Sequence, residues 1–376
     1  MRQPVSLVTV ALFALVLFSA CGSGSATRAA GATALPNIVA GPFPRVVPLG
    51  SSWAFSVTAT GENLQYQWRK DEVPIPGATG FSFTFIPLSL QDGGLLDVVV
   101  SNAAGRVYSQ MIWVRVVSAL GPWAHDLKLC VGTSADTFGP PAPFVAQAGV
   151  PSLARRGNGQ LVAVFQWFPY ENPSAFDQVA TCFSSDGGRT WNTPRSLTFS
   201  GLPAGYQRPF DPTVTVAEDG SLRLYFTCSP QSPTPVNGFY SARSMDGLNY
   251  TFEEGVRFYP GRATVDCAVL RWNGQWHLVS PIGAPQDGAY HAVSVDGLSF
   301  TRLADIPSVG GANWTGNLVE VGNALRFYGS PGQGLWYAST TDGMAWSAPV
   351  SLGLQGGDPA AVEAEPGRWL LVFTGP

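Results

Sequence analysis

The chain has 376 residues, of which 45% are hydrophobic and 12% are charged, and its formal net charge is −4. This length suits two or three domains, and the slightly acidic balance excludes a general electrostatic attraction for nucleic acid. With 43 Gly and 31 Pro, turns recur at short intervals, so the sequence favours strands over long helices.

An apolar run over residues 5–18 follows a single positive residue, Arg2, at the start of the chain. The run is short for a membrane-spanning helix and no basic cluster follows it, so it is typical of a secretory leader. The letters FSAC at its end resemble the lipobox of bacterial lipoproteins. In that family the cysteine becomes lipidated and N-terminal, which implies that Cys21 carries a lipid.

We therefore expect a lipoprotein signal peptide over residues 1–21, followed by a flexible tether of small and polar residues over 22–35. The resemblance implies a protein anchored in a membrane of the bacterial cell envelope, at the outer membrane or the cell surface. A plainly secreted protein is the alternative.

Residues 36–118 show short alternating stretches separated by polar or Gly turns, which predict about seven strands and a β-sandwich. The stretches YQWRKDEVPIPGATG and LQDGGLLDVVVSNAAG resemble bacterial immunoglobulin-like domains. The resemblance makes Trp68 the core tryptophan of the third strand. It also places Leu96 where the family usually has a tyrosine, so the hydrogen bond of that corner is lost. Such domains are commonly spacers or adhesive modules.

Two motifs recur through the rest of the chain. One is an Asp-Gly turn, found in SSDGGRTW, SMDGLNYTF, SVDGLSF and TTDGMAW. The other is a short strand, a Gly-containing turn and an apolar strand; it begins at Val150, Asp211, Asp266, Gly316 and Asp358. Together they make a unit of four antiparallel strands with a period of about 40–60 residues, which predicts a β-propeller.

The last unit ends at Pro376 after its second strand, so its other strands must come from elsewhere in the chain. The segment 127–144, before the first complete unit, fits that role. We therefore predict an all-β chain: an immunoglobulin-like sandwich followed by a five-bladed propeller over residues 123–376. Strands from both ends of that domain would close its last blade and remove exposed edges.

The turn SSDGGRTW resembles the Asp-box of sialidases and related β-propellers. The resemblance implies that its acid, and those of the related turns, lie away from the ligand funnel: Asp186, Asp246, Asp296 and Asp342. Their carboxylates would accept from backbone donors of the turn, and the aromatic residue would pack between sheets. We predict a structural role, because a metal loop would need more oxygen ligands.

In a propeller the innermost strands begin at the mouth of a central funnel, and three of them begin here with acids. Asp211, Asp266 and Asp358 are therefore the candidate catalytic residues. Other side chains expected around them as ligand-binding residues are Arg208, Arg262, Trp314, Asn317, Trp167, Tyr170 and Glu171. Carboxylates, arginines and aromatic rings around one cavity suit a glycan or glycoconjugate. The acids are alternatively simple turn caps.

Three functions stay open. The first, which the sequence favours, is glycan recognition by a surface lipoprotein. The second is glycoside hydrolysis: the layout resembles five-bladed inverting glycosidases such as arabinanases and xylosidases. Asp211 and Asp266 match their two Asp positions, but the fourth repeat offers no Glu for their acid. Sialidases need three arginines and a Tyr–Glu pair, and only Arg208 and Arg262 fit. The third is a structural or adhesive protein without a soluble ligand.

Four cysteines follow the leader: Cys130, Cys182, Cys228 and Cys267. They form no CxxC pair and the chain has three His, so neither a metal site nor another cofactor is expected. Export permits disulfides. Because Cys228 ends a predicted second strand and Cys267 begins the next innermost strand, we predict a disulfide between them, with the other two cysteines free.

Overall fold

The computed structural model describes residues 34–119, 121–230, 236–283, 288–330 and 334–375. The predicted leader with Cys21, and nearly all of the tether, lie outside these residues. The described residues form strands and two short 3-10 helices, η1 (Leu90–Asp92) and η2 (Pro122–Ala124), so the all-β prediction is confirmed. In this part of the chain no helix is long and apolar enough to cross a membrane.

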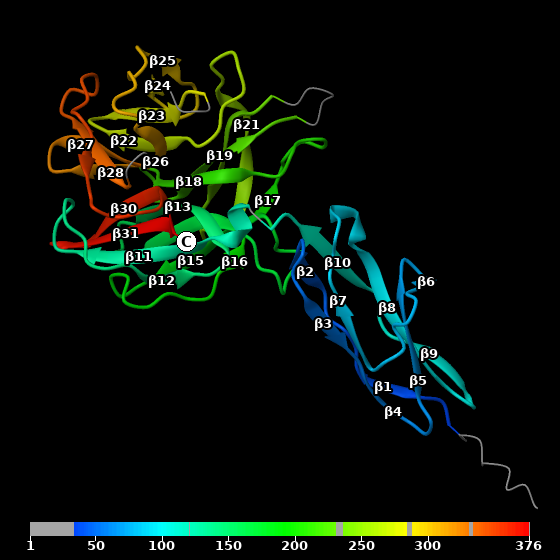
Figure 1. Ribbon diagram of the computed structural model, residues 1–376. Coiled ribbons are helices and arrows are strands. Elements are labelled where there is room, and N and C mark those ends of the chain that lie inside the picture. Colours follow the sequence, from blue (N-terminus) through cyan, green and yellow to red (C-terminus); the bar gives the residue numbers. More distant parts are fainter. Residues whose placement is uncertain (1–33, 120, 231–235, 284–287, 331–333, 376) are drawn as a thin grey trace, which may run out of the picture.

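The N-terminal domain holds ten short strands rather than seven, because several predicted strands are interrupted (Figure 1). The largest sheet has the order β2-β10-β8-β5-β6, with β9 on β8. Two small sheets, β1-β4 and β3-β7, complete the domain. The strands are β1 (Asn37–Ala40), β2 (Arg45–Pro48), β3 (Trp53–Ser56), β4 (Thr58–Thr60), β5 (Gln65–Lys70), β6 (Val73–Pro74), β7 (Ser82–Phe85), β8 (Gly94–Asn102), β9 (Gly105–Tyr108) and β10 (Ile112–Val117).

Trp68 lies at the centre of this domain. Its ring is fully buried, and its indole N–H donates to the carbonyl of Gly80 at 3.0 Å. Leu96 is also buried and packs in the same core. The core therefore forms around the tryptophan that the sequence singles out, and an apolar side chain replaces the expected corner tyrosine.

The second domain consists of five sheets of four or five strands, which are antiparallel except that β17 pairs parallel with β21. Four of them follow one another along the chain: β13-β14-β15-β16, β18-β19-β20-β21 with β17 beside β21, β22-β23-β24-β25 and β26-β27-β28-β29. Their strands are β13 (Ala148–Arg155), β14 (Leu161–Trp167), β15 (Gln178–Ser184), β16 (Arg195–Ser196), β17 (Thr198–Ser200), β18 (Phe210–Val216), β19 (Leu222–Cys228), β20 (Gly238–Ser244), β21 (Asn249–Phe258), β22 (Ala268–Trp272), β23 (Gln275–Pro281), β24 (Ala289–Ser294), β25 (Thr301–Arg302), β26 (Asn313–Val321), β27 (Ala324–Ser330), β28 (Trp336–Thr340) and β29 (Val350–Ser351).

The fifth sheet joins strands from both ends of the domain, in the order β12-β11-β31-β30. Its strands are β11 (Asp126–Gly132), β12 (Ala142–Val145), β30 (Gly357–Glu365) and β31 (Arg368–Gly375). β11 pairs antiparallel with β31 from Asp126 opposite Gly375 to Gly132 opposite Trp369. The predicted pairing of segment 127–144 with the end of the chain is therefore confirmed.

The innermost strands of the five sheets surround one axis. β13, β18, β22, β26 and β30 each contact the next, and β30 also contacts β13. Side chains link them: Ser152 Oγ donates to Asn317 Oδ1 at 2.8 Å and accepts the N–H of Val214 at 3.1 Å. Radially arranged antiparallel sheets around an axis make a β-propeller.

Candidate functional site

The Asp-Gly turns have the hydrogen bonds that were predicted for them. Asp186 Oδ1 accepts the backbone N–H groups of Arg189 and Thr190 at 3.0 and 2.9 Å. Oδ2 accepts the Thr190 hydroxyl at 2.6 Å, and these donors hold the pKa of Asp186 well below its usual range. The Arg189 side chain pairs with Glu365 of the next sheet at 2.7 Å. The turn therefore ties one sheet to its neighbour.

The three related turns repeat this pattern. The carboxylates of Asp246, Asp296 and Asp342 each accept two backbone N–H groups of their own turn, at 2.8–3.0 Å. In each case the pKa is lowered by those hydrogen bonds. In all four acids Oδ1 thus accepts several hydrogen bonds from the turn itself.

Three other acids lie where innermost strands begin, in a backbone conformation that recurs from sheet to sheet. Asp211, Asp266 and Asp358 have φ of +49°, +57° and +48°, and Val150 at the same place in β13 has +49°. Strand register shifts at Val150, Asp211 and Asp358, which marks a β-bulge. Asp tolerates the left-handed region better than most residues, whereas a β-branched Val rarely adopts it.

Hydrogen bonds connect two of these carboxyls to residues of their own and neighbouring sheets. Asp211 accepts the Thr227 hydroxyl at 3.3 Å and the backbone N–H of Asp266. Asp358 accepts the hydroxyls of Thr315 and Thr374. Asp211 and Asp266 are thereby held next to each other at the mouth of the ring.

The pKa values of the cluster (Asp211, Asp266 and Asp358) are raised, because few positive charges compensate the burial of these carboxyls. Burial and then the charge of Asp358 raise the pKa of Asp211 to about 7. Burial, followed by the charges of Asp211 and Asp358, raises the pKa of Asp266 well above the ordinary value of an aspartate. Burial also raises the pKa of Asp358. Burial therefore opposes the charged form of each of the three carboxyls, and the charges of neighbouring carboxyls add to this effect at Asp211 and Asp266.

A cavity of about 630 Å³ opens beside Asp211. It is lined by Pro122, Val150, Gln166, Phe168, Asp177, Gln207, Arg208, Phe210 and Asp211. The predicted ligand-binding residue Arg208 is present, but it is held by Asp177: its Nε donates to the Asp177 carbonyl at 2.6 Å, and its guanidinium pairs with the Asp177 carboxylate. Burial lowers the pKa of Arg208.

Asp177 and Gln166 are among the cavity residues that sequence reasoning missed. Gln166 is 4% exposed, and its Nε2 donates to Asp177 Oδ1 at 2.9 Å. Its Oε1 is buried without a hydrogen-bond partner. Asp177 has φ of +62° and precedes β15. Asp177 lies outside the repeated motifs, and Gln166 lies in the apolar second strand of the first copy, where the pattern gives no signal that its side chain lines a cavity.

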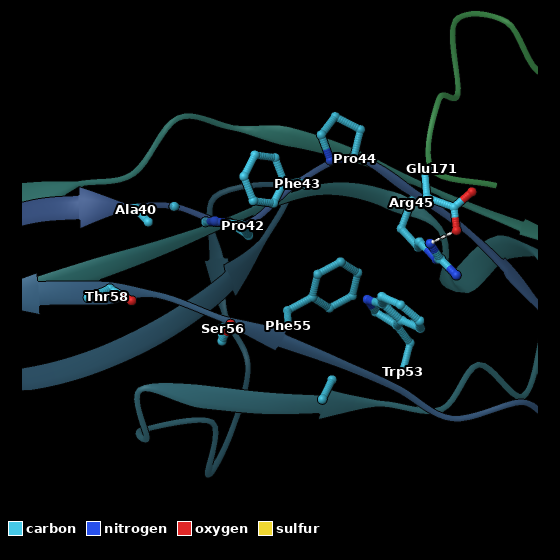
Figure 2. Close-up of a pocket in the computed structure, with 12 residues that line it drawn as sticks. Ala40, Pro42, Phe43, Pro44, Arg45, Trp53, Phe55, Ser56, Thr58 and Glu171 are labelled. Atoms are coloured by element: carbon cyan, nitrogen blue, oxygen red, sulfur yellow. Dashed lines mark hydrogen bonds and ion pairs between the residues drawn. The ribbon is translucent and has the colours of Figure 1, made fainter. Parts of the chain in front are cut away.

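The loop after β14 turns away from the funnel and contacts the N-terminal domain. Glu171 pairs with Arg45 at 2.5 Å, at the rim of a cavity of about 650 Å³ in which Arg45 stacks over Trp53 (Figure 2). Tyr170 accepts the N–H of Val46 through its carbonyl at 2.8 Å. The Tyr170 hydroxyl donates to the carbonyl of Trp123 at 3.1 Å. These two residues join the domains and are left out of the funnel site.

Four further predicted ligand-binding residues have other surroundings. Trp314 is 1% exposed and packs against the rings of Phe327, Trp336 and Trp346, so it cannot stack on a ligand. Trp167 is half-buried against the core between sheets. The remaining two are tied within the fold: Asn317 donates to the Pro151 carbonyl at 3.0 Å, and Arg262 donates to the Tyr290 hydroxyl at 2.7 Å.

The predicted Cys228–Cys267 disulfide is wrong. All four described cysteines are free and buried. Cys228 Sγ donates to the Gln207 carbonyl at 3.0 Å and packs in the core between the first and second sheets, whereas Cys267 packs in the core between the second and third. Adjacent positions along the funnel rim therefore belong to different layers. Within the described residues, no group of three or more His, Cys, Asp or Glu is arranged to hold a metal ion.

Comparison with known proteins gives only distant likenesses. No family model and no curated protein matches the chain. A protein of unknown function from Dyadobacter fermentans is 17% identical over 63% of this chain and 75% of its own, with a TM-score of 0.41. An α-L-arabinofuranosidase from Clostridium thermocellum is 15% identical over 59% and 81%, with a TM-score of 0.46. A Hadza microbial sialidase is 12% identical over 89% and 88%, with a TM-score of 0.41. Likenesses at this level assign no function.

Proposed function

We propose that this protein recognises a glycan at the funnel of a five-bladed propeller, as an exported lipoprotein held by Cys21 in the cell envelope. The observation that carries the proposal is the cluster of Asp211, Asp266 and Asp358 beside a cavity of about 630 Å³. Carboxylates accept hydrogen bonds from sugar hydroxyls, and a cavity of this size fits a small ligand. The immunoglobulin-like domain over 36–118 then serves as a spacer, and the Asp-Gly turns are Asp-boxes.

The hydrogen bonds that each carboxyl accepts within the protein distinguish a binding role from a structural one. In each turn acid Oδ1 accepts at least two backbone N–H groups, and the pKa of each is lowered. Asp211 instead has one long hydroxyl contact and one backbone donor, and its pKa is raised. A turn cap is stabilised as a carboxylate, whereas these groups are destabilised as carboxylates and gain from donors that a ligand brings.

Glycoside hydrolysis is the second candidate, and the raised pKa of Asp211 favours it. A carboxyl that keeps its proton near neutrality can protonate a glycosidic oxygen, while a neighbouring carboxylate activates water. In this chain Asp211 would be the proton donor and Asp358 the base, because the pKa of Asp266 is raised well above its ordinary value. The two functions share a site and differ in whether the bound glycan is cleaved.

The test begins with a glycan array of the exported protein, followed by calorimetric titration of each glycan bound. Asp211→Ala is expected to weaken binding by roughly 1–3 kcal/mol, because hydroxyl groups of the ligand lose their acceptor. Glu320→Ala is the matched control, since this exposed carboxyl lies at the other end of an innermost strand. Equal affinity of Asp211→Ala and the wild type for every glycan bound would contradict a funnel site.

Turnover is tested on the same glycans. If the funnel is catalytic, Asp211→Asn abolishes product formation and largely spares affinity, because the amide keeps the shape but donates no proton. If it only binds, the wild type forms no product. The anchor is tested separately: Cys21→Ala should move the protein from the membrane fraction to the soluble fraction, and unchanged fractionation would contradict lipidation.

A further inference from the structure

The charged groups at the funnel mouth are unbalanced. Asp211, Asp266 and Asp358 lie together, and Arg208 is the nearest arginine to act on Asp211. That guanidinium is already paired with the Asp177 carboxylate, which neutralises most of its charge. The charge of the exposed His125 imidazole acts on Asp358, and the charge of Arg115 acts on Arg208. Asp177 and Asp211 both line the cavity and share one lining arginine, Arg208, so the lining carries a surplus of negative charge.

The cavity wall adds an acceptor that lacks a donor. Gln166 lines the cavity and is only 4% exposed. Its Nε2 donates a hydrogen bond to Asp177 Oδ1. Its Oε1 has no partner within the described residues. A buried polar atom without a partner costs free energy until a donor reaches it. The unpaired acceptor in this wall therefore favours a ligand that carries N–H or O–H donors.

Among the described residues that line the cavity, the one arginine is Arg208, which Asp177 already holds, so an acidic sugar would find no free guanidinium there. Recognition of a carboxylate needs an arginine with free donors or an equivalent cation. Arg208 is tied to Asp177, and Arg262 donates to Tyr290. A ligand carboxylate would instead face Asp177 and Asp211, which both line the cavity, and like charges at short range repel.

We propose that the funnel selects a glycan bearing a free amine, and that it rejects glycans whose bound unit carries a carboxylate. The proposal rests on the glycan-recognition function argued above and names the chemical class of its ligand. An ammonium group supplies the missing positive charge and three N–H donors at once. It stabilises the carboxylate forms of the cluster, so its binding releases a proton from the protein.

The experiment compares three tetrasaccharides by isothermal titration at pH 6.5 in the presence of a chelator. They are a β-1,4-linked glucosamine tetramer, the matched N-acetylglucosamine tetramer and a galacturonic acid tetramer. The glucosamine tetramer is expected to bind about tenfold more tightly than the N-acetylated one, and the galacturonic acid tetramer is expected not to bind. Titration in two buffers of different ionisation enthalpy should show proton release with the amine alone.

Variants locate the effect. Asp358→Asn and Asp211→Asn should each reduce the preference for the amine over its N-acetylated match, whereas Glu320→Ala should leave it unchanged. The preference should also shrink as salt is raised, but less than for an exposed ion pair. A preference that survives both Asp variants belongs to another part of the surface and overturns the proposal.

The outcomes distinguish this inference from the function on which it rests. If the N-acetylated or acidic tetramer binds at the funnel as well as the amine, with binding lost in Asp211→Ala, the charge selection is wrong and glycan recognition stands. If tetramers bind but Asp211→Ala changes nothing, the funnel is not the glycan site. If none of the three binds, the inference of an amine ligand is overturned.

Discussion

His291 is a buried group whose charge the fold opposes strongly. It is 1% exposed, its ring stacks on His277 with centroids 5.4 Å apart, and its Nε2 lies 3.2 Å from His277 Nδ1. Trp272 and Trp346 pack edge-on against the pair. Burial, followed by the charge of His277, lowers the pKa of His291 to about 4, and burial lowers that of His277 as well.

The sign of the pH effect follows from this shift. The unfolded chain binds a proton at His291 near pH 6.5, whereas the folded chain resists it until about pH 4. Between these values the unfolded state binds more protons, so stability falls as pH is lowered. The free energy of unfolding should drop by about 2 kcal/mol between pH 7 and pH 5 from this residue alone.

The assay compares the wild type with His291→Gln, a side chain that does not titrate and can still hydrogen-bond to His277. Urea unfolding is followed by tryptophan fluorescence at pH 7 and pH 5, and the difference in free energy between the two proteins is taken at each pH. Contributions from the carboxyl cluster, which run in the opposite direction, cancel in this difference. The advantage of the wild type over the variant should shrink by about 2 kcal/mol at the lower pH. A difference that stays constant would refute the reasoning.

Three other predictions follow from the fold and the site. Deleting residues 368–376 removes β31, which pairs with both β30 and β11, so calorimetry should show loss of the second domain's transition; an unchanged melting temperature would contradict the shared sheet. The four described cysteines should stay unreactive toward a thiol reagent until the protein is denatured, because burial raises their pKa; rapid labelling of native protein would be inconsistent with this. Asp177→Asn should free Arg208 to pair with Asp211 and lower the pKa of that carboxyl, and a carboxyl NMR titration matching the wild type would rule this out.

The repeats in the sequence predict the architecture well, because each sheet is encoded by its own copy of the pattern. The incomplete last copy even predicts the pairing of β11 with β31. The hydrogen bonds of Asp186 and its relatives also follow from local residues, since an Asp-Gly turn satisfies itself within a few positions. Local patterns of this kind survive in the fold without long-range information.

The sequence predicts the lining of the site less well, because side-chain direction depends on contacts between distant segments. Glu171 and Tyr170 follow a strand that ends near the funnel, but the N-terminal domain captures them through Arg45 and Val46. Trp314 lies two positions before Gly316, the predicted strand start, and the bulges of β26 place its ring in the core. Periodicity alone does not predict such one-residue shifts.

The left-handed residue that recurs at the start of the innermost strands allows the side chain at the funnel mouth to differ from sheet to sheet. Val150, Asp211, Asp266 and Asp358 share nearly the same φ although one is apolar and three are acids. The backbone conformation at this position thus accepts either an apolar or an acidic side chain. Val150→Asp would add a fourth carboxyl to the mouth at a position that suits Asp better than Val. A substitution at this position in one sheet can therefore change the ligand preference while the backbone of the ring of sheets is kept.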